Sequence, residues 1–97
     1  MNKIIEDMII PHVPSEYSDV VKSIISKVRG ASLSSFESET SSHIILLGEL
    51  KDNISLTIAD GDFFLSNIKF GGKNFIVIHM VISLDNGDSI DNIGKQS

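Results

Sequence analysis

The sequence predicts an α+β fold: two N-terminal helices packed on an antiparallel, four- to five-stranded β-meander. Two observations predict it. Apolar residues recur at helical spacing as far as Gly30, and beyond it they alternate with a period of two. Turn signals then separate the apolar runs about every 8–12 residues, which is typical of antiparallel strands joined by short hairpins. The 97 residues are expected to form a single domain, 1–97.

The first helix is expected over about residues 2–10. Its apolar residues recur at helical spacing and Pro11 ends the pattern: Met1, Ile4, Ile5, Met8 and Ile9. An apolar strand is the alternative, because isoleucine is β-branched and fits pleated sheets well.

The second helix is expected over about residues 15–29. One face carries an unbroken apolar stripe: Tyr17, Val20, Val21, Ile24, Ile25 and Val28. Ser15 is the expected N-cap, and Gly30 is the expected stop after the C-terminus.

Strands are expected over about residues 31–36, 43–50, 54–59, 63–70 and 75–84, the first as a weak edge strand. The stretches DGD (60–62) and GGKN (71–74) are hairpin signals. Residues 85–97 are expected to form a turn and a tail, because DNG at 85–87 favours a reverse turn. The aspartates of this tail do not match the ligand spacing of a calcium loop, so no metal site is expected.

Both faces of the expected sheet are apolar. The core face of strand 75–84 is formed by Ile76, Ile78, Met80, Ile82 and Leu84. The opposite face is a possible apolar interface formed by Phe75, Val77, Val81, Ile45 and Leu47. An antiparallel sheet with one solvated face should alternate between apolar and polar residues. We therefore expect one of three arrangements: a curled sheet, one helix on each face, or a face covered by another protein chain.

No catalytic, cofactor or metal motif is present, so the chain is expected not to be an enzyme. The absence of cysteine excludes disulfides and thiolate chemistry. His43 and His79 lie in phase with the second apolar face. Either could pair with Asp60 or Asp62 in a small hydrolase, or both could bind a metal, but no HxH, HExxH or serine-elbow motif accompanies them. A half-buried histidine with a satisfied hydrogen bond is the expected state.

The charge balance disfavours nucleic-acid binding, because 13 acidic residues face 8 basic ones and the net charge is −5. No apolar stretch reaches the roughly 18 residues that span a bilayer. The N-terminal stretch is not a signal peptide, since Glu6 and Asp7 interrupt its apolar run. The expected location is the cytoplasm, with no membrane association.

Carboxylates gather in the expected turns: Glu37, Glu39, Asp60, Asp62, Asp85 and Asp88. In being small, acidic and cysteine-free, with acidic turns, the chain resembles bacterial immunity proteins, including those of contact-dependent growth inhibition systems, whose toxins are often basic nucleases. The resemblance implies a non-catalytic inhibitor whose carboxylates mimic phosphates and occlude the active site of a basic toxin. Because alternate turns of a meander lie at opposite ends, the three acidic groups are expected not to form a single patch. The alternative is a homo-oligomeric structural or adaptor subunit that uses the second apolar face.

Overall fold

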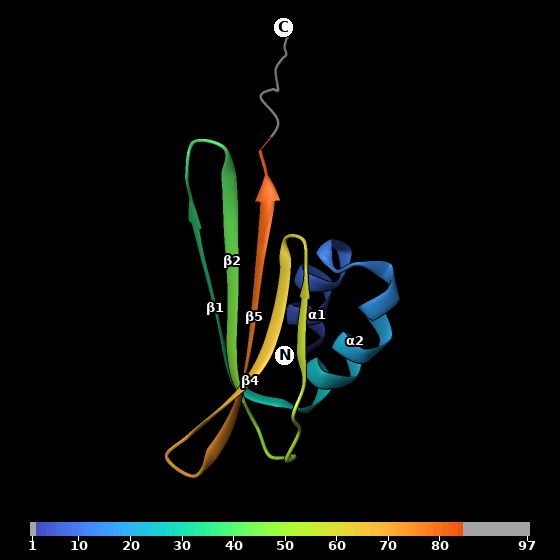
Figure 1. The fold of residues 1–97 in the computed structure, drawn as a ribbon, viewed down its shortest axis with the longest axis vertical. Coiled ribbons are helices and arrows are strands. Elements are labelled where there is room, and N and C mark those ends of the chain that lie inside the picture. The colour runs from blue at the N-terminus through green and yellow to red at the C-terminus, as the bar shows by residue number, and fades with distance from the viewer. Residues whose placement is uncertain (1, 85–97) are drawn as a thin grey trace, which may run out of the picture.

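The computed structural model describes residues 2–84 and confirms the predicted α+β fold (Figure 1). Helix α1 (Asn2–Ile9) is followed by two 3-10 turns, η1 (Ile10–His12) and η2 (Ser15–Tyr17), and by helix α2 (Ser18–Lys27). The strands are β1 (Val28–Glu37), β2 (Ser41–Leu50), β3 (Thr57–Asp60), β4 (Phe63–Phe70) and β5 (Lys73–Ser83). The predicted tail, with Asp85 and Asp88, lies outside the described residues. Within residues 2–84, no helix is long and apolar enough to cross a membrane.

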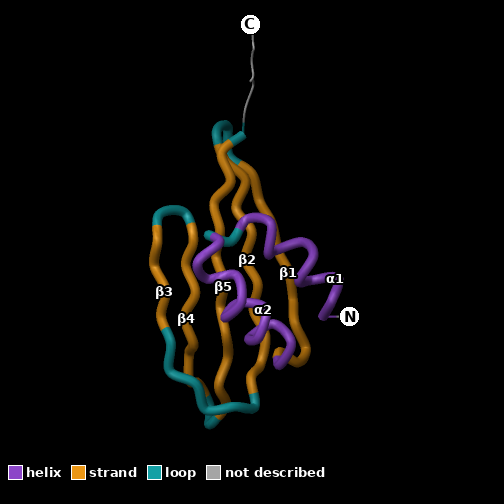
Figure 2. Tube along the Cα trace, turned by 90° about the vertical axis from the view of Figure 1, so that its right-hand side faces the viewer, coloured by secondary structure: helices purple, strands orange, loops and turns teal. Residues whose placement is uncertain are grey.

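The five strands are antiparallel, but their order is β1-β2-β5-β4-β3, which is not that of a simple meander. A β1–β2 hairpin and a β3–β4–β5 meander meet where β5 pairs with β2. The loop over residues 51–56 carries the chain from β2 to the far edge, below β5 and β4 (Figure 2). The hairpin signals in the sequence predict only which strands pair within the β1–β2 hairpin and within the β3–β4–β5 meander. The β2–β5 pairing instead places two strands that are apolar on both faces next to each other inside the sheet.

The chain leaves α2 earlier than predicted. The helix ends at Lys27, and Val28 is already extended, with φ −74° and ψ 141°. Gly30 is therefore not a helix stop. Its φ of +58° places it in a β-bulge, where the register of β1 against β2 shifts between Arg29 and Ser32. The predicted N-cap is also wrong, because Ser15 begins η2 and the N-cap position of α2 is Tyr17.

The strand predicted over residues 54–59 begins later, at Thr57, because the residues before it form a loop held by two asparagines. The buried Asn74 side chain donates to the carbonyl oxygen of Asp52 at 2.9 Å. The Oδ1 atom of Asn67 accepts from the backbone N–H of Leu56 at 2.9 Å. Side-chain hydrogen bonds thus satisfy loop groups that a longer β3 would have paired with β4.

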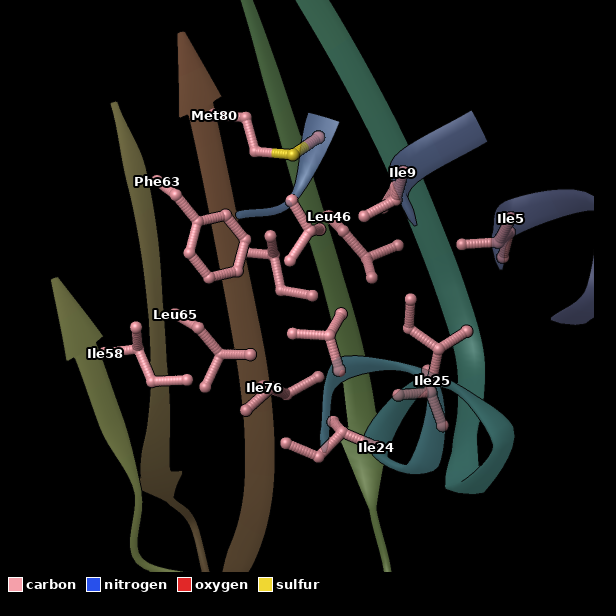
Figure 3. Packing of buried hydrophobic residues seen from close by; sticks show 14 of the residues in the cluster. Ile5, Ile9, Ile24, Ile25, Leu46, Ile58, Phe63, Leu65, Ile76 and Met80 are labelled. Atoms are coloured by element: carbon pink, nitrogen blue, oxygen red, sulfur yellow. The ribbon is translucent and has the colours of Figure 1, made fainter. Parts of the chain in front are cut away.

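Both helices lie on the same face of the sheet (Figures 1 and 2). The buried isoleucines of the two helices, Ile5 and Ile9 of α1 and Ile24 and Ile25 of α2, belong to one cluster with the apolar side chains of β2, β4 and β5 (Figure 3). The predicted core face of β5 is confirmed at its centre, where Ile76, Ile78 and Met80 are buried. Ile82 and Leu84 are half-buried. Full burial, as at Ile76 and Ile78, contributes about 1.5–3 kcal/mol for each side chain.

Gly48 of β2 makes room for the junction between α2 and β1. It is buried on the helix-covered face, and a Cβ atom built on it would clash with Cγ1 of Val28. Val28 is itself buried, at 4% exposure. The missing side chain therefore lets the first residue of β1 pack directly on β2.

We predict that Gly48→Ala lowers the free energy of unfolding by about 1–3 kcal/mol, because the added methyl group overpacks this junction. Urea denaturation followed by circular dichroism measures the loss. The control is a double-mutant cycle with Val28→Ala, which removes the clashing atom. If the double variant loses as much as the two single losses added together, Val28 is not the residue that excludes a side chain at position 48.

Candidate interaction surface

The sheet face opposite the helices is uncovered within the described part of the chain (Figure 1). In residues 2–84, the sheet does not curl over this face and no helix lies on it (Figure 1). The register places the five predicted interface residues together on this face, with Ile45 opposite His79 and Leu47 opposite Val77. Leu47 is 44% exposed, and the other four are half-buried. Of the three expected arrangements, the first two are wrong, and the third stays a prediction.

Strands β1 and β4 extend this face with aromatic and aliphatic side chains that the sequence analysis missed. Phe36 is 54% exposed, Phe64 41%, Ile68 48% and Phe70 77%. For the three residues of β4, the alternation is the signal that could have found them, since Phe63 and Leu65 are buried and the intervening positions face the other way. We call the following set the open face: Phe36, Ile45, Leu47, Phe64, Ile68, Phe70, Phe75, Val77 and Val81, with His43 and His79.

Charged side chains are confined to one end of the open face. In the described residues these are Arg29 and Glu49, which are opposite each other in the β1–β2 register, and Lys73 at the start of β5. All three lie toward the end of the sheet where β2 ends and β5 begins. The centre of the open face therefore holds no Asp, Glu, Lys or Arg.

The open face is large for a monomer. β5 has 11 residues and the sheet five strands. At about 3.4 Å per residue and 4.8 Å between neighbouring strands, the footprint is on the order of 700 Å². Stable protein interfaces bury about 800 Å² of accessible surface per partner, so the open face is close to the size of one complete interface.

Two histidines lie at the centre of the open face. His43 Nδ1 and His79 Nε2 are 3.1 Å apart and share a hydrogen bond, in which either ring can be the donor. The His43 ring also stacks on Phe36, with centroids 4.5 Å apart and planes 5° from parallel. Neither histidine forms an ion pair with Asp60 or Asp62, the partners that a hydrolase would need. The expectation of a half-buried histidine with a satisfied hydrogen bond is confirmed for both.

The acidic turns lie together at one end of the sheet, which corrects the expectation that they lie at opposite ends. Strands β1, β3 and β5 run in the same direction, so the β1–β2 and β3–β4 turns point the same way (Figure 2). Glu37 and Glu39 therefore lie at the same end as Asp60 and Asp62. Both turns hydrogen-bond to the end of β5: Val81 N donates to Asp62 O at 3.0 Å, and Leu84 N to Thr40 O at 2.9 Å.

Lysines gather at the opposite end of the sheet. Lys51, Lys69 and Lys73 line a hollow of about 430 Å³ beside the loop over residues 51–56. Lys27, at the end of α2, forms an ion pair with Asp52 of that loop at 3.3 Å. We call the end of the sheet that carries Glu37, Glu39, Asp60 and Asp62 the acidic end; the three lysines that line the hollow lie at the other end of the sheet.

Tyr17, directly before α2, contacts the acidic end of the sheet. Its ring stacks on Phe63, with centroids 6.3 Å apart. Loss of hydration, together with the nearby carboxylates of Glu16 and Asp60, raises the pKa of the Tyr17 hydroxyl above its usual value of 10.0. Asp60 thus faces the helix-covered side of the sheet, away from the histidine pair.

We predict that spectrophotometric titration of Tyr17, which is the single tyrosine of a chain without tryptophan, gives a midpoint above pH 10.0. Because the pKa of Tyr17 is higher in the folded than in the unfolded protein, the neutral hydroxyl contributes to the free energy of unfolding. This contribution is complete below pH 10 and is lost as the pH rises through the folded pKa. Asp60→Asn should lower the midpoint. Asp62→Asn is the matched control and should leave it in place. An equal fall in both variants would show that Asp60 is not a specific partner.

No group of three metal-ligating side chains forms within residues 2–84. Comparison of the chain with protein-family models, with curated proteins and with solved structures finds no match.

Proposed function

We propose that this protein is a non-catalytic, protein-binding subunit that forms a homodimer through its open face. One observation carries the proposal: a sheet face of roughly interface size has a largely apolar centre without Asp, Glu, Lys or Arg, and nothing in residues 2–84 covers it. Antiparallel sheets with two apolar faces pack against a second sheet or a layer of helices. The short helices of this chain supply one such layer, and a second copy supplies the other.

A second copy fits this face better than an unrelated chain. Exposed apolar sheet surface promotes aggregation, so it has to be covered soon after synthesis. Another copy of the same chain is always present in equal amount. The charges at the rim, from Arg29, Glu49 and Lys73, are of both signs, so the face does not select a partner of opposite charge.

We predict that Val77→Asp converts the dimer to a monomer and weakens dimerisation at least about a hundredfold, because an unpaired carboxylate would be buried at the centre of the interface. Val77 lies on β5 opposite Leu47 of β2 and Ser66 of β4. Sedimentation velocity over a range of protein concentrations measures the dissociation constant.

The matched control is Val20→Asp, the same substitution at a site on α2 that is 40% exposed. It should leave dimerisation unchanged. Circular dichroism shows whether each variant stays folded. A parent protein that is monomeric at high micromolar concentration would overturn the homodimer proposal.

The clustering of acidic turns favours a second candidate function, that of an immunity protein that inhibits a basic, nuclease-like toxin. Glu37, Glu39, Asp60 and Asp62 lie at one end of the molecule, away from the lysines. Carboxylates so placed would mimic the phosphates of the toxin's substrate and would speed encounter with a basic surface. This function is compatible with dimerisation through the open face, because the acidic end is a different part of the surface.

For this second function, we predict that a basic protein captured from the source organism associates at least about tenfold more slowly with a variant carrying Glu37→Lys, Glu39→Lys and Asp62→Lys. The salt dependence of the association rate should fall as well. Glu6→Lys with Asp7→Lys, two charge reversals on α1, is the control and should change the rate little. Equal rates for the parent and the three-site variant would eliminate inhibition through the acidic end.

A further inference from the structure

The histidine pair is a feature that dimerisation through an apolar face does not by itself require. We infer that His43 and His79 are two of the four ligands of a transition-metal site that two copies of the chain complete at the centre of the dimer. The inference rests on the proposed homodimer. It identifies zinc, or a divalent ion with the same preference for imidazole, as the ligand of the open face.

The spacing of the two rings fits metal binding. Zinc binds histidine nitrogens at about 2.0–2.1 Å in a tetrahedral arrangement, which places two ligand nitrogens about 3.3 Å apart. His43 Nδ1 and His79 Nε2 are 3.1 Å apart without a metal. A metal ion would replace the proton that the two nitrogens now share, with little movement of either strand.

The surroundings keep the pair ordered and free of competing charges. The Phe36 ring, stacked on His43, restrains the imidazole, and the strand neighbours of the pair are apolar: Val81 opposite His43, and Ile45 and Phe64 opposite His79. The described charged groups of the open face are Arg29, Glu49 and Lys73, near the far end of the strands. Within residues 2–84, no carboxylate forms an ion pair with either ring, so no anionic group competes with a metal ion for the ring nitrogens.

The position of the pair on the sheet explains how two ligands can become four. β5 is the central strand, and His79 lies near the middle of its open-face residues, between Val77 and Val81. In a two-fold symmetric dimer, residues near the axis meet their own counterparts. An axis through the middle of β5 brings the two histidine pairs together and supplies four nitrogens, the closed coordination that is typical of a structural zinc site.

The test is zinc titration of EDTA-treated full-length protein, followed by calorimetry for stoichiometry and by sedimentation velocity for dimerisation. We expect one zinc per two chains and a dimer dissociation constant lowered at least about tenfold by zinc. Cobalt(II) in place of zinc should give the intense visible absorption of a tetrahedral site.

His43→Gln and His79→Gln should each abolish these effects, whereas His12→Gln is the control and should change nothing, because His12 lies in η1 on the helix side. If the parent dimer binds no zinc at micromolar concentration, or binds one per chain without tighter dimerisation, the shared site is wrong and the homodimer stands. If the parent remains monomeric with and without zinc, the homodimer and the site fail together.

Discussion

The packing of α1 and α2 against β2, β4 and β5 is the interaction on which the other features of this structure depend. The two helices have 8 and 10 residues, so they are only about 12 and 15 Å long. β5 has 11 residues, which span about 37 Å at about 3.4 Å per residue, more than twice the length of either helix. Side chains such as Ile78 and Met80 are sealed under the helices, while Ile82 and Leu84, nearer the end of the sheet, are half-buried. The helices cannot cover even one face completely, and they leave none of their surface for the second face.

This shortage of covering surface is the reason to expect a second layer on the open face. A strand that is apolar on both sides is stable when both sides are covered, which is why central strands of layered folds lack the polar alternation of solvated sheets. β5 has this pattern, yet one of its sides faces outward in the single chain. The same side holds the two hydrogen-bonded histidines, polar groups placed where an interface would exclude water. An interface between two copies would explain both the apolar side of β5 that faces outward and the histidine pair on that side.

The sequence was sufficient for the parts of the fold that depend on local patterns. The period-two alternation of β5 identified the core face correctly, and the hairpin signals located β4 at the residues it occupies. Gly30 was misassigned because a glycine with positive φ serves a helix end and a β-bulge equally well, and local sequence does not distinguish the two. Nothing in the sequence of residues 51–56 indicates that this loop passes β5 and β4, so the strand order could not be predicted.

The candidate surfaces were predictable to different degrees. The shared face of Leu47, Val77 and Phe75 followed from alternation within each strand. The contact between His43 and His79 did not, because it depends on the register between β2 and β5, which are separated in sequence by two other strands. The grouping of the acidic turns required strand directions rather than turn composition. Long-range register was therefore the missing information in both cases.

The most direct test of the central claim is isotope-filtered NMR on a mixture of labelled and unlabelled chains. The account predicts intermolecular contacts between methyl groups of Val77, Val81 and Leu47 in one copy and the open-face phenylalanine rings of the other. Intermolecular contacts that instead involve α1 and α2, or a dimer in which the open-face methyl groups contact only water, would contradict it.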